Sequence, residues 1–184
     1  DIIKELKKII NDQKVGERIR DGFKVAIIGP ANAGKSSLLN YLADRDVAIV
    51  SEIAGTTRDV IESHLNLDGY PVIISDTAGI RDSKDEIEKK GIKLSLKRAE
   101  DADLKIIILE PKSTDFKHFF KNLLDDRSIL IVNKMDHENI EVDEEIKKLN
   151  PLYISVKKNI NLDSLVNEVK KNLENKFIPT TDIY

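Results

Sequence analysis

The chain has 184 residues, which suits one domain of ordinary size with a single sizeable core. Its 30 Lys and Arg against 33 Asp and Glu leave a formal net charge of -3, which excludes a global basic field that attracts nucleic acid or membrane. It has no cysteine, which excludes disulfides, thiolate metal sites and a cysteine nucleophile. No apolar run reaches the roughly 20 residues of a membrane span and the first residues lack the layout of a signal peptide, so we expect a cytoplasmic protein without membrane contact.

The first predicted element is a helix that begins at residue 2. Residues 2–10 place four isoleucines and one leucine on one helical stripe, with the lysines elsewhere. Such a stripe requires an apolar partner. Two interpretations stay open: the helix lies at the edge of a larger protein, or it packs back onto this domain.

Residues 29–36 fit the phosphate-binding pattern G-x-x-x-x-G-K-[ST] at every fixed position. An apolar run at 24–28 precedes them and a helical pattern at 38–43 follows, which is the strand-loop-helix context of a P-loop. In such a loop the backbone N–H groups close around phosphate oxygens, Lys35 adds a positive charge, and Ser36 offers a hydroxyl to Mg²⁺. The alternative is a glycine-rich turn that binds no ligand. Further motifs at the ends of the other predicted strands would make this alternative less credible.

The next segments predict a loop and a hairpin. Residues 44–59 carry no sustained periodicity and have the composition of a mobile switch loop. Residues 60–67 alternate as in a half-buried strand, Asp68 and Gly69 form the turn, and 70–75 form a nearly apolar strand that we expect to be covered on both faces. This strand delivers residues 76–79, D-T-A-G, to its carboxyl end, where open α/β sheets bind ligands and where an acidic residue can hold a metal-bound water.

The second half of the chain alternates helices and strands. We expect helices over 86–102, around 116–124, over 141–149 and over 162–173, with strands over 104–109, 128–132 and 152–154. Together with the hairpin, this order predicts a mostly parallel six-stranded sheet with helices on both faces and one antiparallel edge strand.

Residues 133–136, N-K-M-D, follow one of these strands. The Asp136 carboxylate can accept hydrogen bonds from N1–H and the 2-amino group of guanine, which adenine does not present in that form. The aliphatic stem of Lys134 can lie over the base plane. An isolated N-K-x-D is a weak signal, but its position downstream of the P-loop and D-T-A-G favours a guanine nucleotide site, and residues 155–157 complete the base pocket less specifically.

The ordered motifs GPANAGKSS, IAGTTRD, DTAG, NKMD and SVK resemble those of translation-factor-class GTPases, with a Ras-like P-loop fold. The residues at 53–59, 76–81 and 85–92 resemble the G domain of the MnmE (TrmE) family of bacterial tRNA-modification GTPases. The resemblance covers about residues 23–173. It implies a flanking helix over 1–21 that is the stub of a missing helical domain, a G domain over 22–175 and a tail over 176–184.

The same resemblance implies the ligands of the site. GTP would be bound by Asn32, Ala33, Gly34, Lys35, Ser36, Ser37, Ser51, Ile53, Gly55, Thr56, Thr57, Asp76, Thr77, Ala78, Gly79, Asn133, Lys134, Asp136, Ser155, Val156 and Lys157. Magnesium would be held by Ser36 and Thr57. Potassium would be held by Asn32, Ser51, Ile53 and Thr56. Ala31 and Val156 depart from the proline and alanine usual in the family at these positions.

Ile80 stands where Ras-like enzymes have a water-orienting glutamine, and its side chain has no hydrogen-bonding atom. The resemblance implies that potassium replaces an arginine finger and that Glu88, with Thr57, acts on the attacking water. It also implies a nucleotide- and potassium-dependent dimer of G domains, and modification of tRNA wobble uridine with the flavoprotein GidA; this chain itself is not expected to bind nucleic acid. The alternatives are a ribosome-assembly GTPase of the Era or Der type, or a GTP-binding switch with negligible turnover.

Overall fold

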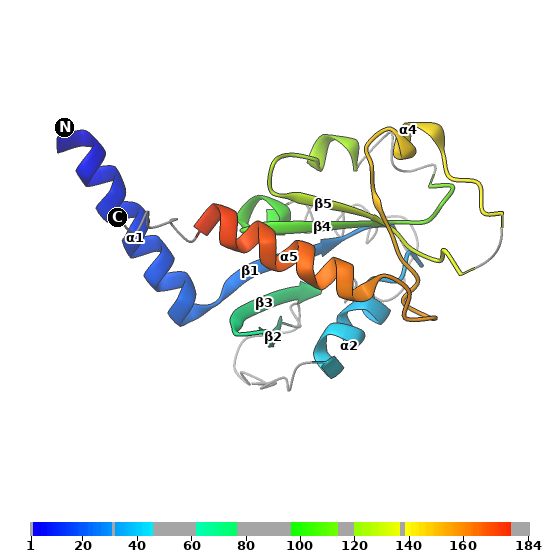
Figure 1. The fold of residues 1–184 in the computed structure, drawn as a ribbon, viewed down its shortest axis with the longest axis horizontal. Coiled ribbons are helices and arrows are strands. Elements are labelled where there is room, and N and C mark those ends of the chain that lie inside the picture. The colour runs from blue at the N-terminus through cyan, green and yellow to red at the C-terminus, as the bar shows by residue number, and fades with distance from the viewer. Residues whose placement is uncertain are drawn as a thin grey trace.

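The computed structural model describes residues 2–30, 32–45, 62–76, 97–113, 120–136 and 139–177. Within these ranges the chain forms one six-stranded sheet with helices packed against it (Figure 1). The strands are β1 (Phe23–Ile28), β2 (Glu62–Leu67), β3 (Tyr70–Asp76), β4 (Leu104–Leu109), β5 (Ser128–Val132) and β6 (Leu152–Tyr153). The helices are α1 (Ile2–Asp21), α2 (Lys35–Arg45), the 3-10 helix η2 (Lys121–Leu123), α4 (Glu144–Lys147) and α5 (Leu162–Phe177).

The strands lie in the order β2-β3-β1-β4-β5-β6, with β2 antiparallel at one edge and the other strands parallel. The antiparallel pair is joined by Asp68 and Gly69, whose φ values of 48° and 99° give the backbone twist of a tight hairpin. Asn66 Oδ1 accepts a hydrogen bond of 2.7 Å from the Gly69 N–H and closes this turn. The predicted mixed sheet with one antiparallel edge strand is confirmed.

Both faces of the sheet carry a hydrophobic core. On one face, α2 and α5 pack against β1, β3, β4 and β5. The closing helix expected over 162–173 carries apolar residues at helical spacing, and all five are buried there: Leu162, Leu165, Val166, Val169 and Leu173. On the other face, Ile107 and Val132 pack with Ile146 of α4, and Ala26 packs with Ala99 of a helical segment at 97–101. The prediction of helices on both faces is therefore correct.

Three predicted elements are shorter or less buried than the sequence predicts. The helix expected over 141–149 begins only at Glu144, because the Asp143 side chain caps it by accepting a hydrogen bond of 2.8 Å from the Glu145 N–H. The helix expected around 116–124 is a single 3-10 turn in its described part, and at Leu124 the backbone is extended. In β3, Val72 and Ile74 are buried but Ile73 is only half-buried, so complete burial of this strand is wrong.

The chain's first helix is longer than its apolar stripe predicts and projects from the body of the sheet (Figure 1). Ile2 and Ile3 are exposed, so its first turn is not covered by this domain. Its last turns are attached: Arg18 Nε donates to Asp103 Oδ1 at 2.7 Å, and Asp103 Oδ2 accepts from the Lys24 N–H at 2.9 Å. The direction in which the helix leaves β1 is therefore set at its carboxyl end.

At the other end of the chain, α5 continues to Phe177, two residues beyond the predicted domain end at 175. Residues 178–184 of the predicted tail lie outside the described residues. None of the helices in the described part of the chain is both long and apolar enough to cross a membrane.

Candidate functional site

Three of the predicted motifs meet at the carboxyl edge of the sheet. Strands β1, β4, β5 and β6 are parallel, so the loops that follow them leave from the same edge. The P-loop follows β1, residues 133–136 follow β5, and residues 155–157 follow β6. This topology brings together segments that lie far apart in the sequence, as the contact between Ala33 and Asn133, 100 residues apart, shows.

The ammonium group of Lys35 contacts the first two residues of the P-loop. Its Nζ donates hydrogen bonds to the carbonyl oxygens of Gly29 at 2.8 Å and Pro30 at 2.7 Å. Directly beside it, α2 begins, and the first N–H groups of a helix have no partner within the helix and carry the positive end of its dipole. A fixed ammonium next to a helix amino terminus is a site that suits a phosphate group.

The second glycine of the P-loop is required by its surroundings. Gly34 has a φ of 103°, a conformation that residues with a side chain rarely adopt. A Cβ atom at this position would lie 2.3 Å from Asn133 Nδ2. Gly34 therefore permits the close approach of the P-loop to the loop after β5.

Asn133 connects the loops of the site, a role that its motif did not reveal. It is buried, its Nδ2 donates to the Ala33 carbonyl at 2.8 Å, and its Oδ1 accepts from the Val156 N–H at 3.1 Å. Its backbone N–H donates to the Leu109 carbonyl at 2.9 Å. One side chain thus ties the phosphate loop to the loops that follow β5 and β6.

The Asp136 carboxylate is positioned by Ser155. Ser155 is fully buried, and its hydroxyl donates to Asp136 Oδ1 at 3.1 Å and accepts from the Lys158 N–H at 3.2 Å. An ionised carboxylate can only accept hydrogen bonds, so this half-buried group is suited to a ligand that presents two N–H donors. The guanine edge predicted from the sequence has this arrangement.

The other predicted residues of the base loops lie around this carboxylate. Val156 is half-buried and its side chain packs against the main hydrophobic core, while Lys157 is exposed. Lys134 is exposed, has a φ of 65°, and its Nζ pairs with the carboxylate of Glu110. Sequence reasoning missed Glu110; its only signal was an acidic residue placed directly after the predicted strand 104–109.

The structure also contains groups that fit the implied metal ions. Ser36 and Ser37 are exposed in the first turn of α2, and Asn32 is exposed with a φ of 63°. Hydroxyl and amide oxygens are ligands that hard cations accept, and Mg²⁺ is commonly held by one or two protein groups together with substrate phosphates. Within the described ranges no three His, Asp or Glu side chains form a metal site of their own. Ser36 thus presents a hydroxyl oxygen of the kind that Mg²⁺ accepts, and Asn32 presents an exposed amide oxygen.

Part of the predicted site lies outside the described residues: Ser51, Ile53, Gly55, Thr56, Thr57, Thr77, Ala78, Gly79, Ile80 and Glu88. Asp76 is the last residue of β3 and pairs in register with Ile27 of β1. Its backbone therefore reaches the same sheet edge as the P-loop.

Comparisons with known proteins identify relatives of this chain. The tRNA modification GTPase MnmE of Pelagibacter ubique (strain HTCC1062) is 63% identical over 183 residues, which cover 100% of this chain and 41% of that protein. MnmE of Rickettsia rickettsii (strain Sheila Smith) is 46% identical over 178 residues, covering 95% of this chain and 40% of that protein. The chain thus spans less than half the length of these relatives. The predicted resemblance to the MnmE family is confirmed.

The fold has solved counterparts as well. The crystal structure of Aquifex aeolicus Era bound to GDP.AlF4- matches with a TM-score of 0.58 and 26% identity, covering 81% of this chain and 56% of that one. This likeness confirms the predicted Ras-like P-loop fold. A family model described as 50S ribosome-binding GTPase matches residues 24–159. The chain, with its GTPase domain, therefore belongs to the 50S ribosome-binding GTPase family.

Proposed function

We propose that this chain binds GTP and hydrolyses it to GDP and phosphate. The observation that carries the proposal is the link that Asn133 makes between the P-loop and the base loops, with its side chain bonded to Ala33 and Val156. This link holds a site suited to phosphate at a defined position relative to a carboxylate suited to guanine. Its support from relatives is the name GTPase, which the matching family and the MnmE proteins share.

In this proposal Lys35 and the amino terminus of α2 bind the phosphates and stabilise the negative charge that develops during phosphoryl transfer. Asp136 binds the guanine edge, and the stem of Lys134 covers the base. Magnesium, held by Ser36 and Thr57, would neutralise phosphate charge when bound. The remaining contacts to GTP, around the γ-phosphate, would come from Ser51, Ile53, Gly55, Thr56, Asp76, Thr77, Ala78 and Gly79.

Hydrolysis also requires a group that orients the attacking water. Ile80 cannot orient it, so we propose Glu88 and Thr57 for this role, with potassium at Asn32, Ser51, Ile53 and Thr56 in place of an arginine finger. The support is the resemblance of residues 53–59 and 85–92 to the MnmE family, together with the 63% identity to one member. An arginine finger accelerates hydrolysis by about 10³- to 10⁵-fold, so the potassium effect should be large.

The test is the rate of GTP hydrolysis in K⁺ and in Na⁺ buffer, measured over a range of protein concentrations. We expect faster hydrolysis in K⁺ and a rate per subunit that rises with concentration, because the proposal includes pairing of two G domains. Equal rates in both salts would contradict the potassium site. Tight GTP binding with negligible turnover, unchanged in Glu88→Ala, would support a switch module instead.

We further propose that hydrolysis serves tRNA wobble-uridine modification in the cytoplasm, in a longer protein that acts with the flavoprotein GidA. The matching relatives are named tRNA modification GTPases, and the chain spans 41% of the first of them. The flanking helix at 1–21 would then connect the G domain, 22–175, to a helical domain, with 176–184 as a tail.

A ribosome-assembly role of the Era type is the second candidate. The likeness to Era and the family name favour it, but the identity to Era is 26% against 63% to MnmE. Binding of the chain to purified 50S ribosomal subunits, dependent on GTP, would favour the Era-type role. The proposed tRNA function predicts no such binding.

A further inference from the structure

The ion pair between Lys134 and Glu110 connects the NKMD motif to a residue outside the five motifs. Lys134 Nζ donates a hydrogen bond to Glu110 Oε1. Glu110 directly follows β4, and Lys134 follows the end of β5 by two residues. Because Leu109 and Val132 are partners in the parallel ladder, both side chains leave the sheet at the edge that carries the candidate site.

The backbone around Lys134 is held on both sides. The Asn133 N–H donates to the Leu109 carbonyl at 2.9 Å, and the Met135 N–H donates to the Ile154 carbonyl at 3.1 Å. Between them, Lys134 has a φ of 65°, which residues other than glycine adopt infrequently. The loop therefore sets the direction in which the Lys134 side chain leaves the backbone, while the conformation of the four-carbon stem depends on what holds its end.

The Lys134 side chain is 46% exposed, so packing alone does not order it. A lysine side chain has many rotamers and loses much conformational entropy when it is fixed. We infer that Glu110 is a positioning residue: its carboxylate anchors the Lys134 ammonium, so that the stem is already placed beside the base pocket when a nucleotide arrives. This inference rests on the proposed function, because the stem has this use only if a guanine base occupies the pocket beside Asp136.

The expected effect is modest because the pair is partly open to water, with the Glu110 side chain 36% exposed. Partly exposed ion pairs change an equilibrium by up to about fivefold. Glu110→Gln should therefore weaken GDP binding by about two- to fivefold, mainly through faster release. The kcat of GTP hydrolysis should stay at its wild-type value, because Glu110 acts through Lys134 and not on the reacting phosphate.

The chain offers a matched control in Glu141, whose carboxylate pairs with Lys112 at 3.1 Å with both side chains largely exposed. Glu141→Gln changes the net charge by the same amount as Glu110→Gln. Dissociation constants would be measured by fluorescence titration with GDP and with inosine diphosphate, which lacks the 2-amino group, at low and high salt. Melting temperatures of all variants would confirm that they are folded.

We expect Glu110→Gln to weaken binding of both nucleotides by the same factor, because the lysine stem contacts the face of the ring and not the 2-amino group. High salt should narrow the difference from wild type, Glu110→Asp should restore part of the affinity, and Glu141→Gln should bind like wild type. In a Lys134→Met background, Glu110→Gln should have no effect, because the ammonium it anchors is gone.

Two results would overturn the inference: Glu110→Gln binding GDP as tightly as wild type, or Glu141→Gln losing as much affinity as Glu110→Gln. An effect of Glu110→Gln that persists in the Lys134→Met background would also contradict it. Failure of the wild-type chain to bind GDP is a different outcome, because it contradicts the proposed function and removes this inference with it.

Discussion

Lys35 and Lys105 mark the two ends of the central sheet and hold their ammonium groups in different ways. Lys35, at the carboxyl end of β1, is half-buried and donates to the carbonyls of Gly29 and Pro30. Lys105, near the amino end of β4, is buried and donates to the Leu123 carbonyl at 2.6 Å and to the Asp125 carboxylate at 2.7 Å. The first arrangement keeps a positive charge beside a loop that suits phosphate. The second neutralises a buried charge.

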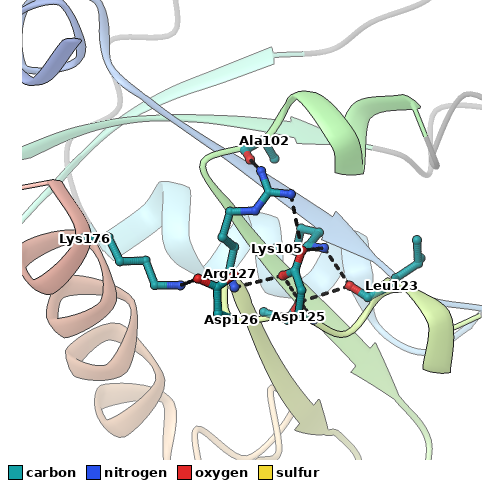
Figure 2. A network of polar contacts seen from close by, with 8 residues as sticks. Ala102, Lys105, Leu123, Asp125, Asp126, Arg127 and Lys176 are labelled. Atoms are coloured by element: carbon teal, nitrogen blue, oxygen red, sulfur yellow. Dashed lines mark hydrogen bonds and ion pairs between the residues drawn. The ribbon is translucent and has the colours of Figure 1, made fainter. Parts of the chain in front are cut away.

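The network at the amino end continues beyond Lys105, as Figure 2 shows. Arg127 donates to Asp125 Oδ2 at 3.3 Å and to the Ala102 carbonyl at 3.2 Å, and Lys176 of α5 pairs with Asp126 at 3.8 Å. These contacts connect the turn before β5 to the segment before β4 and to the closing helix. Charged side chains at this end therefore stabilise the fold, while those at the opposite end serve ligand binding in the proposed function.

The largest expected effect comes from exchanging the lysine at the carboxyl end. Lys35→Met should lower the rate of GTP hydrolysis by about 100- to 1000-fold, because it removes a fixed positive charge from the transferring phosphate. Its free energy of unfolding should change by less than about 1.5 kcal/mol, since Gly29 and Pro30 are only half-buried and water can replace the two hydrogen bonds that their carbonyls lose. Single-turnover hydrolysis and urea unfolding measure the two quantities. Slow hydrolysis caused by unfolding would contradict the assignment.

The second-largest effect is expected for the ion pair between Asp125 and Lys105 near the amino end of β4. Asp125→Asn should lower the free energy of unfolding by about 1–3 kcal/mol, because the buried Lys105 ammonium loses its carboxylate while Asp125 itself is partly exposed to water. GDP affinity should stay within about twofold of wild type. Asp126→Asn is the matched control: its carboxylate is 87% exposed, so we expect a change below about 0.5 kcal/mol. Equal losses in both variants would show that Lys105 does not depend on Asp125.

The pH dependence of stability is a second test of the role of Asp125 at the amino end of the sheet. Burial alone would raise the pKa of the Asp125 carboxyl, but hydrogen bonds from Lys105, the Arg127 N–H and Ser128 outweigh it, and the pKa lies below its ordinary value of 3.8. The carboxylate therefore stabilises the fold above pH ~4 and loses this contribution as the pH falls further. The difference in unfolding free energy between wild type and Asp125→Asn should be constant from about pH 5 to 8 and shrink below pH ~4. Urea unfolding at several pH values measures it; a difference that grows in acid would be the wrong sign.

The smallest expected effect concerns the attachment of α1. Arg18→Gln removes the ion pair with Asp103 but leaves the hydrogen bond between Asp103 and the Lys24 N–H. Because the Arg18 side chain is 29% exposed, we expect a loss of about 1 kcal/mol in unfolding free energy and no change in GDP affinity. Thermal unfolding and nucleotide titration check both parts. A change in GDP affinity would show that this attachment is coupled to the nucleotide site.

Local patterns predicted much of the fold and the core of the site. The hairpin follows from Asp68 and Gly69 between two strand patterns, and the docking of α5 follows from five apolar positions at helical spacing. The P-loop and Asp136 could be proposed from the sequence because binding of phosphate and of guanine requires these residue types in a fixed order along the chain.

Contacts between distant segments were not predictable in this way. Three sets of contacts depend on which strands are neighbours and on their register. They are the hydrogen bonds of Asn133 with Ala33 and Val156, the ion pair of Lys134 with Glu110, and the ion pair of Lys105 with Asp125. The apolar spacing at residues 2–10 likewise gave no signal for a helix that continues to Asp21. Asp143 is of a residue type that caps helices, but the charged helical pattern already begins at residue 141, so the sequence predicts an earlier start than α4 has.

In the proposed function, the carboxyl end of the sheet recognises guanine through Asp136, and the nucleotide selectivity of Asp136→Asn tests this most directly. Xanthosine diphosphate carries a carbonyl oxygen where GDP carries the 2-amino group, so an amide N–H at residue 136 can donate to it. We expect the wild-type chain to bind GDP more tightly than xanthosine diphosphate, and Asp136→Asn to reverse this order. Unchanged preference for GDP in Asp136→Asn, or equal binding of GDP and ADP by the wild-type chain, would contradict the account.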